Sequence, residues 1–82
     1  MIEVEVLLFA AARDAAGVAR AAVALPAPAT AGGVLEALIA RHPALEPHRS
    51  SLRLAVNREY VDPARPVASG DEVAVIPPTC GG

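Results

Sequence analysis

The chain has 82 residues, enough for one small domain with a modest core and little room for a catalytic cleft. Its formal charge is −2, its basic residues are scattered arginines with no lysine, and its only aromatic residues are Phe9 and Tyr60. A nucleic-acid surface needs a basic run or aromatic stacking platforms, so we expect no nucleic-acid partner.

The N-terminal third predicts a strand, a short helix and a second strand. Residues 2–9 first alternate apolar and acidic side chains and then become wholly apolar, which is typical of a central strand covered on both faces. Residues 10–16 are rich in alanine and favour a helix, with Gly17 as a left-handed stop. Residues 18–25 then have the length and alternation of a strand between Gly17 and a proline.

The main helix is predicted over residues 31–41. Thr30 precedes it and has a side chain that accepts hydrogen bonds from the first free N–H groups. Helical spacing gives one apolar stripe, which consists of Ala31, Val34, Leu35, Leu38 and Ile39. His42 stands before Pro43, and this disfavours helical geometry at the histidine, so the helix should end there.

The C-terminal half predicts a strand over residues 52–56, a turn at 57–59, a short return at 60–61 and a last strand over 72–76. A helix between two strand pairs fits a mixed sheet with that helix packed across it. The expected fold class is therefore α+β, in the β-grasp (ubiquitin-like) arrangement. We expect this domain to occupy residues 1–76, with an extended C-terminal tail at 77–82.

The tail has the sequence Pro77-Pro78-Thr79-Cys80-Gly81-Gly82. Its two prolines lack N–H groups and fix φ, so it should leave the sheet as an extended arm that reaches at most about 20 Å. The two glycines have no Cβ, so they can pass a narrow constriction and leave the terminal carbonyl carbon open to attack. An ordinary frayed terminus is the alternative interpretation.

Neither a metal site nor a membrane segment is expected. The candidate soft metal ligands are His42, His48 and Cys80, which have no recognised spacing, and we interpret both histidines as exposed loop residues. The longest uncharged stretch, residues 21–35, is too short to cross a bilayer and contains two prolines and two glycines. The chain begins Met-Ile-Glu without the basic residues of a signal peptide, and one cysteine suits a reducing compartment, so we expect a cytoplasmic protein.

Four segments together resemble the MoaD/ThiS family of ubiquitin-like sulfur carriers, and most closely its MoaD branch. They are Leu8-Phe9-Ala10 with Arg13-Asp14 and Gly17; Ala55-Val56-Asn57 with Tyr60-Val61; Ser69-Gly70-Asp71-Glu72-Val73; and Pro77-Pro78 with Gly81-Gly82. These segments cover nearly the whole chain. The Gly-Gly end alone is less specific, because ubiquitin-like modifiers share it.

The resemblance implies the small, sulfur-carrier subunit of molybdopterin synthase, in molybdenum cofactor biosynthesis. An E1-like adenylating enzyme (MoeB-like) would use ATP to adenylate Gly82, a sulfur donor would convert it to a thiocarboxylate, and a large subunit (MoaE-like) would supply the catalytic side chains. The chain would thus be no enzyme by itself and would bind no cofactor. A carrier for thiamine or another thiolated product, a modifier of protein lysines and a plain β-grasp interaction module are the alternatives.

The resemblance also implies a docking patch beside the tail, made of Phe9, Tyr60 and Ile76 with Arg13 at its rim. Strand alternation places Val73 and Val75 on one face and Ile76 on the other, and an exposed aromatic patch marks a partner site. The alternative is that the three apolar residues belong to the core.

Cys80 departs from the family pattern, which usually has Ser or Thr at that position. Its thiol lies two residues from the carbonyl that would be activated, and a thiolate there could capture the acyl group or sulfur. The interpretation we prefer is a small, tolerated tail residue without a chemical role.

Overall fold

The computed structural model describes residues 1–77, and residues 78–82 of the predicted tail lie outside the described range. The elements in chain order are β1 (Ile2–Leu8), α1 (Ala10–Ala16), β2 (Arg20–Leu25), β3 (Ala29–Thr30), α2 (Ala31–Arg41), the 3-10 helix η1 (Pro43–Ser51), β4 (Arg53–Val56), β5 (Glu59–Val61), β6 (Pro66–Val67) and β7 (Glu72–Ile76). Each helix and strand predicted from the sequence is present, with its ends displaced by at most two residues.

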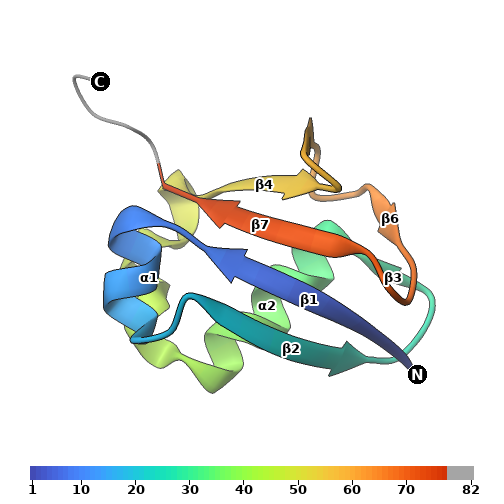
Figure 1. Cartoon of the computed structure of the whole chain (residues 1–82), viewed down its shortest axis with the longest axis horizontal. Helices are drawn as coiled ribbons and strands as arrows, with labels where there is room; N and C mark the ends of the chain where they lie inside the picture. The colour runs from blue at the N-terminus through green and yellow to red at the C-terminus, as the bar shows by residue number, and fades with distance from the viewer. Residues whose placement is uncertain (78–82) are drawn as a thin grey trace.

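Five strands form one mixed sheet in the order β2-β1-β7-β4-β5. β1 pairs antiparallel with β2 and parallel with β7, and β4 pairs antiparallel with both β7 and β5. Figure 1 shows α2 crossing the rear face of this sheet, while the other face, called here the outer face, is turned toward the viewer. The predicted α+β, β-grasp arrangement is confirmed, with β1 inside the sheet.

The two faces of β1 differ in a way that the sequence analysis did not foresee. Val4, Val6 and Leu8 point into the core beneath α2 and are at most 2% exposed. From the apolar run at the end of β1 we predicted that both faces of this strand would be covered by the rest of the chain. This prediction was wrong. Leu7 is only half-buried and Phe9, just beyond β1, is 46% exposed. The run therefore marks apolar surface on the outer face.

The two α-helices begin and end as their sequences predict. Gly17 ends α1 with a φ of 78°, and its N–H donates to the carbonyl of Arg13. The side-chain oxygen of Thr30 accepts a hydrogen bond of 3.1 Å from the N–H of Gly33 and so caps α2. The predicted stripe of α2 is buried against the sheet along its whole length, with members Ala31, Val34, Leu35, Leu38 and Ile39.

Three elements were not predicted. β3 and β6 pair as a separate two-stranded ribbon, and η1 replaces the loop expected after α2. η1 is anchored by Leu45, which is fully buried, and Arg49 forms ion pairs with Glu36 of α2 and with Glu46. The interpretation of His42 and His48 as exposed was also wrong, because the packing of η1 leaves both half-buried.

The glycine pair in the first turn of α2 gives a test of this packing. A Cβ on Gly33 would make only ordinary contacts, at 3.5 Å from the Thr30 side-chain oxygen and 3.7 Å from Leu25. A Cβ on Gly32 would lie 3.1 Å from the carbonyl oxygen of Pro63, which also accepts the Gly32 N–H at 2.8 Å and cannot withdraw freely. We expect Gly33→Ala to stabilise the fold by about 0.5–1 kcal/mol and Gly32→Ala to lose that gain or destabilise. Urea unfolding of both variants checks this, and equal gains would contradict it.

Candidate functional site

The outer face carries a hollow of about 460 Å³ near the C-terminal end of β7. Its floor follows from strand register, because Ala74 of β7 lies opposite Leu7 of β1 on one side and opposite Ala55 of β4 on the other. Side chains that share a row across paired strands point to the same face. Two neighbouring alanines in this row leave the centre of the sheet surface low.

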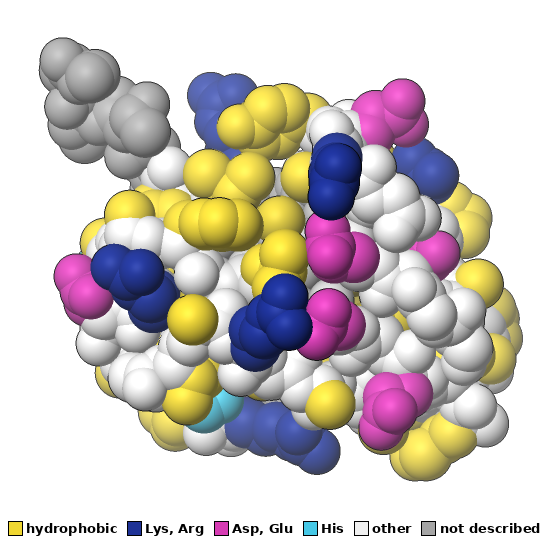
Figure 2. Space-filling view, in the orientation of Figure 1, with side chains coloured by type: hydrophobic (Ala, Val, Ile, Leu, Met, Phe, Trp, Pro, Cys, Tyr) yellow, Lys and Arg dark blue, Asp and Glu magenta, His cyan; other side chains and the backbone are white. Residues whose placement is uncertain are grey.

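Larger apolar side chains form the walls of the hollow. Phe9, Tyr60 and Ile76 all line it, although they come from the end of β1, from β5 and from β7. Tyr60 is 67% exposed and Ile76 is half-buried, so neither these two nor Phe9 is enclosed in the core. Figure 2 shows yellow side chains gathered on this face close to the end of β7, with dark-blue groups around them. An exposed apolar cluster of this kind is typical of a surface that a partner covers.

The structure thus brings together three of the four residues predicted as a patch. The fourth, Arg13, is exposed on α1, where its N–H donates to the carbonyl of Phe9 at 3.3 Å, but it does not line the hollow. Sequence reasoning missed six lining residues, namely Leu7, Arg20, Ala55, Arg58, Glu72 and Ala74. The signal for Leu7 was its place in the outward half of the β1 alternation, whereas the alanines carry no signal until strand register is known.

A hydrogen-bonded network holds the β4–β5 hairpin, which carries Tyr60, against the start of β7. Asn57 donates its N–H to the carbonyl of Glu72 at 2.8 Å and accepts the Glu72 N–H at 3.1 Å with its side chain. One carboxylate oxygen of Asp71 accepts from the Ala68 N–H at 2.8 Å, and the other accepts from the Asn57 side-chain amide at 3.1 Å. These two hydrogen bonds hold the pKa of Asp71 below its ordinary value of 3.8, and the one from the Ala68 N–H has the larger effect.

Because the folded pKa of Asp71 is depressed, its stabilising contribution is fully present above the ordinary pKa and is lost as the pH falls through the folded value. We expect Asp71→Asn to lower Tm at pH 7 and to approach the parent as the pH drops below about 4. Thermal unfolding at a series of pH values checks this. Asp14→Asn on the exposed surface of α1 is the control. A Tm difference that stayed constant down to pH 2 would contradict the assignment.

The predicted tail begins directly beside the hollow. Ile76 is the last residue of β7 and one wall of the hollow, and Pro77, which follows it, is buried. The other predicted tail residues, Pro78, Thr79, Cys80, Gly81 and Gly82, lie outside the described residues. A partner that covers the hollow would therefore also be close to Pro77, the first residue of the predicted tail.

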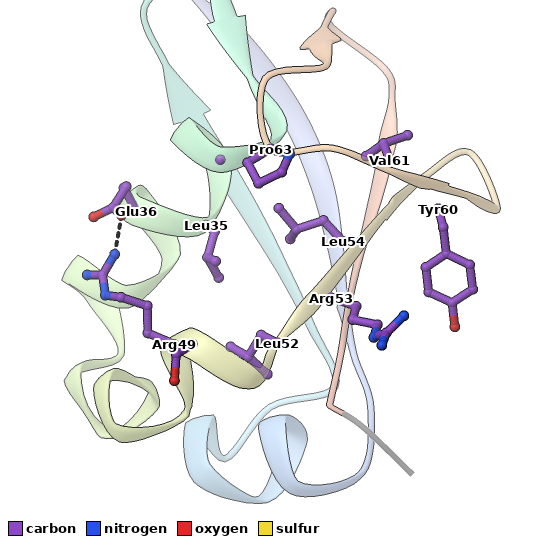
Figure 3. A pocket seen from close by; sticks show the side chains of 11 residues that line it. Leu35, Glu36, Arg49, Leu52, Arg53, Leu54, Tyr60, Val61 and Pro63 are labelled. Carbon is purple, nitrogen blue, oxygen red and sulfur yellow. Dashed lines mark hydrogen bonds and ion pairs between the residues drawn. The ribbon is translucent and has the colours of Figure 1, made fainter.

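A second hollow, of about 540 Å³, lies at the sheet edge between α2, η1 and the β4–β5 hairpin. Figure 3 shows Leu35, Leu52 and Leu54 around its centre, with the ion pair of Glu36 and Arg49 closing one side. Tyr60 lines this hollow as well as the first one. The side chain of Tyr60 is thus a ridge between two depressions.

Neither a metal cluster nor a membrane-spanning helix is found within residues 1–77. No three His, Cys, Asp or Glu side chains gather closely enough there to hold an ion. None of the helices of this part of the chain is both long and apolar enough to span a bilayer.

A mixed five-stranded sheet crossed by one helix, with an apolar hollow beside its last strand, defines a β-grasp protein of the ubiquitin-like class. The chain belongs to the ThiS family, whose model matches residues 6–82. It is 41% identical over 81 residues to the molybdopterin synthase sulfur carrier subunit of Arabidopsis thaliana, covering 99% of this chain and 84% of that protein. The human protein of the same name is 36% identical over 85 residues, covering 100% of this chain and 97% of its own length.

Solved structures place the fold in the same class. The crystal structure of SAMP1 from Haloferax volcanii superposes with a TM-score of 0.88 at 34% sequence identity, and the match covers 98% of this chain and 99% of that one. The predicted membership of the MoaD/ThiS family is therefore confirmed.

Proposed function

We propose that this chain is the sulfur-carrier subunit of a molybdopterin synthase. The observation that carries the proposal is the position of the hollow, which lies beside the strand that leads into the Gly-Gly end. The similarity along the whole chain to proteins named as sulfur carrier subunits supports the same function. The role that we assign to the chain is to present its own C-terminus to partner enzymes.

The chemistry proposed for the tail follows from the properties of a terminal carboxylate. The α-carboxyl group of Gly82 has an ordinary pKa of about 3.3–3.7, so at neutral pH it is an anion and a poor electrophile. An E1-like adenylating enzyme would use ATP to form an acyl-adenylate with release of pyrophosphate, and a sulfur donor would then displace AMP. The product is a thiocarboxylate, a sulfur nucleophile at the end of a six-residue segment that can span at most about 20 Å.

The acceptor in this proposal is cyclic pyranopterin monophosphate, which receives two sulfurs as the dithiolene of molybdopterin. One carrier delivers one sulfur, so two carrier turnovers are needed for each product. The large subunit of the synthase would bind the hollow and supply the catalytic side chains. The carrier itself would be no enzyme, would hold no cofactor and would work in the cytoplasm.

Two titratable groups within residues 1–77 have shifted pKa values. The two shifted pKa values found there are the lowered one of Asp71 and the raised one of Arg49, which the Glu36 and Glu46 carboxylates cause. Both groups serve hydrogen-bonded networks between elements of the fold, and neither lines the hollow beside β7.

Complex formation tests the proposal. The tagged chain is co-expressed with the large synthase subunit of the same organism, and we expect the two to elute together as a stable complex.

The similarity to SAMP1, a protein named as a small archaeal modifier, favours a protein modifier as the second candidate. A modifier would instead be recovered in adducts linked from Gly82 to lysines of other proteins, because this chain has no lysine.

Cys80→Ser tests whether the tail thiol takes part in the chemistry. We expect the variant to keep most of its sulfur transfer in a reconstituted synthase assay, because the family usually has a hydroxyl residue at that position. A loss of about a hundredfold or more would place the thiol on the reaction path as a nucleophile.

A further inference from the structure

The arginines of this chain fall into two groups. Four are engaged with other groups: Arg20 with Glu5, Arg41 with the carbonyl of Ala22, Arg49 with Glu36 and Glu46, and Arg65 with Glu59. Within residues 1–77 the other three have neither an ion pair nor a side-chain hydrogen bond, and these are Arg13, Arg53 and Arg58.

All three unengaged arginines lie close to residues that form the hollow. Arg53 is the register partner of Ile76 on the neighbouring strand, and Arg58 lines the hollow directly. Arg13 lies one helical turn after Phe9. Glu72 lines the hollow too, but no salt bridge joins it to Arg58. The apolar centre therefore has guanidinium groups around it that are available to carboxylates of another molecule.

Arg58 stands at a position that is unfavourable for an arginine backbone. Asn57 and Arg58 form the two-residue turn between β4 and β5 with φ values of 50° and 72°. Both values are positive, as in a type I′ turn, where the second position strongly favours glycine. A left-handed residue that keeps a long charged side chain beside a docking surface points to a role for that side chain.

The floor of the hollow sets the shape of what can enter it. Ala55 and Ala74 are neighbours across β4 and β7, and Phe9, Tyr60 and Ile76 stand around them. The depression is therefore deep only at its centre, where it can take a side chain that projects from a partner surface. An apolar side chain there would cover the side chains of Phe9, Tyr60 and Ile76, while the lining also includes charged residues.

We propose that the large synthase subunit inserts one apolar side chain over Ala55 and Ala74 and places an acidic residue beside it, which pairs with Arg58. The inference rests on the proposed function, because it names the chemistry of the partner at the same site. The apolar side chain supplies buried area, and the acidic residue fixes its orientation and steers the approach of the two proteins.

Filling the floor tests the first half of the proposal. Ala74→Leu adds volume on the outer face without touching the core, so thermal unfolding should stay close to the parent. We expect the affinity for the purified large subunit to fall by about tenfold or more, since a core contact of an interface tolerates overpacking poorly. The matched control is Ala24→Leu, the same change on the same face of edge strand β2, opposite Glu3 and outside the hollow. Its affinity should stay within about twofold of the parent.

Two substitutions at Arg58 test the second half. Arg58→Glu should weaken binding by about tenfold or more at low salt, with a smaller difference at high salt, because exposed charge pairs are screened. Arg65→Glu makes the same change in net charge at a residue that does not line the hollow and should have little effect. Arg58→Gly should raise Tm by relieving the turn while still lowering affinity, a combination that a structural role for Arg58 cannot produce.

The outcomes separate this inference from the function on which it rests. If the parent chain does not bind the large subunit at all, the proposed function and the inference fall together. If the parent binds and either Ala74→Leu or Arg58→Glu binds equally well, the inference is overturned while the proposed function stands. Weaker binding by both variants, with both controls unchanged, supports it.

Discussion

Phe9→Ala is expected to weaken the complex with the large synthase subunit by roughly ten- to a hundredfold while leaving the fold intact. The side chain is 46% exposed in the free chain, so its removal creates no core cavity and should lower the free energy of unfolding by less than about 1 kcal/mol. In the complex the same ring would be a wall of the occupied hollow, and truncating a buried aromatic anchor is costly. Titration calorimetry measures the affinity, and urea unfolding measures the stability.

Val18→Ala is the control for this experiment, because Val18 is also exposed and apolar but does not line the hollow. Its affinity should equal that of the parent. If Phe9→Ala instead unfolds, and its remaining folded fraction binds normally, Phe9 belongs to the core and the docking assignment is wrong.

Removal of Gly82 is expected to abolish sulfur loading. The deletion makes Gly81 the terminus and shortens the arm by about 3.5 Å, whereas catalytic geometry tolerates errors of only about 1 Å. The new terminus is again a glycine carboxylate, so reach alone distinguishes it from the parent. The fold should be unchanged, because the deleted residue follows the last strand.

Addition of one alanine after Gly82 is the complementary change. It moves the carboxylate too far along the arm and adds a Cβ, which the narrow path proposed for the two glycines would exclude. Both variants are incubated with the adenylating enzyme, ATP and a sulfur source, and their intact masses are followed over time. Sulfur gain by either one at the parent rate would show that the end of the chain is not positioned as the account requires.

The parts of the fold that the sequence predicts well are those whose signal is local. The five-residue stripe of α2 and the inward positions of β1 follow from the period of one element and its burial on one side. Thr30 and Gly17 act only on the neighbouring helical turn, so the start of α2 and the end of α1 can also be predicted from the sequence. In α2 and in the first part of β1, the local apolar and polar pattern is enough to predict which side is buried.

The elements that the sequence analysis missed depend on contacts that no local pattern contains. β3 and β6 have two residues each and are separated in sequence by residues 31–65. η1 contains Pro47 and has one buried anchor, so it lacks the periodicity that predicts a helix. All three elements form because of contacts with parts of the chain that are distant in sequence, and such contacts are tertiary information.

The residues of the candidate site also differ in whether the sequence alone predicts them. Phe9, Tyr60 and Ile76 could be predicted as a patch, because the resemblance to the MoaD/ThiS family implies one there. Ala55 and Ala74 could not, since an alanine becomes the floor of a hollow only when strand register sets it beside another small residue. The apolar end of β1 was misread because an apolar strand face that stays on the surface has the same composition as one covered by its own chain.

The central claim is that the terminal carboxylate of Gly82 is the reacting group of this protein. Intact-mass measurement after incubation with the adenylating enzyme, ATP and a sulfur source tests it directly. We expect a gain of about 16 Da, one oxygen replaced by sulfur, with the added sulfur on the carboxylate of Gly82. An unchanged mass under conditions in which the adenylating enzyme consumes ATP with this chain, or sulfur recovered on Cys80 instead, would contradict it.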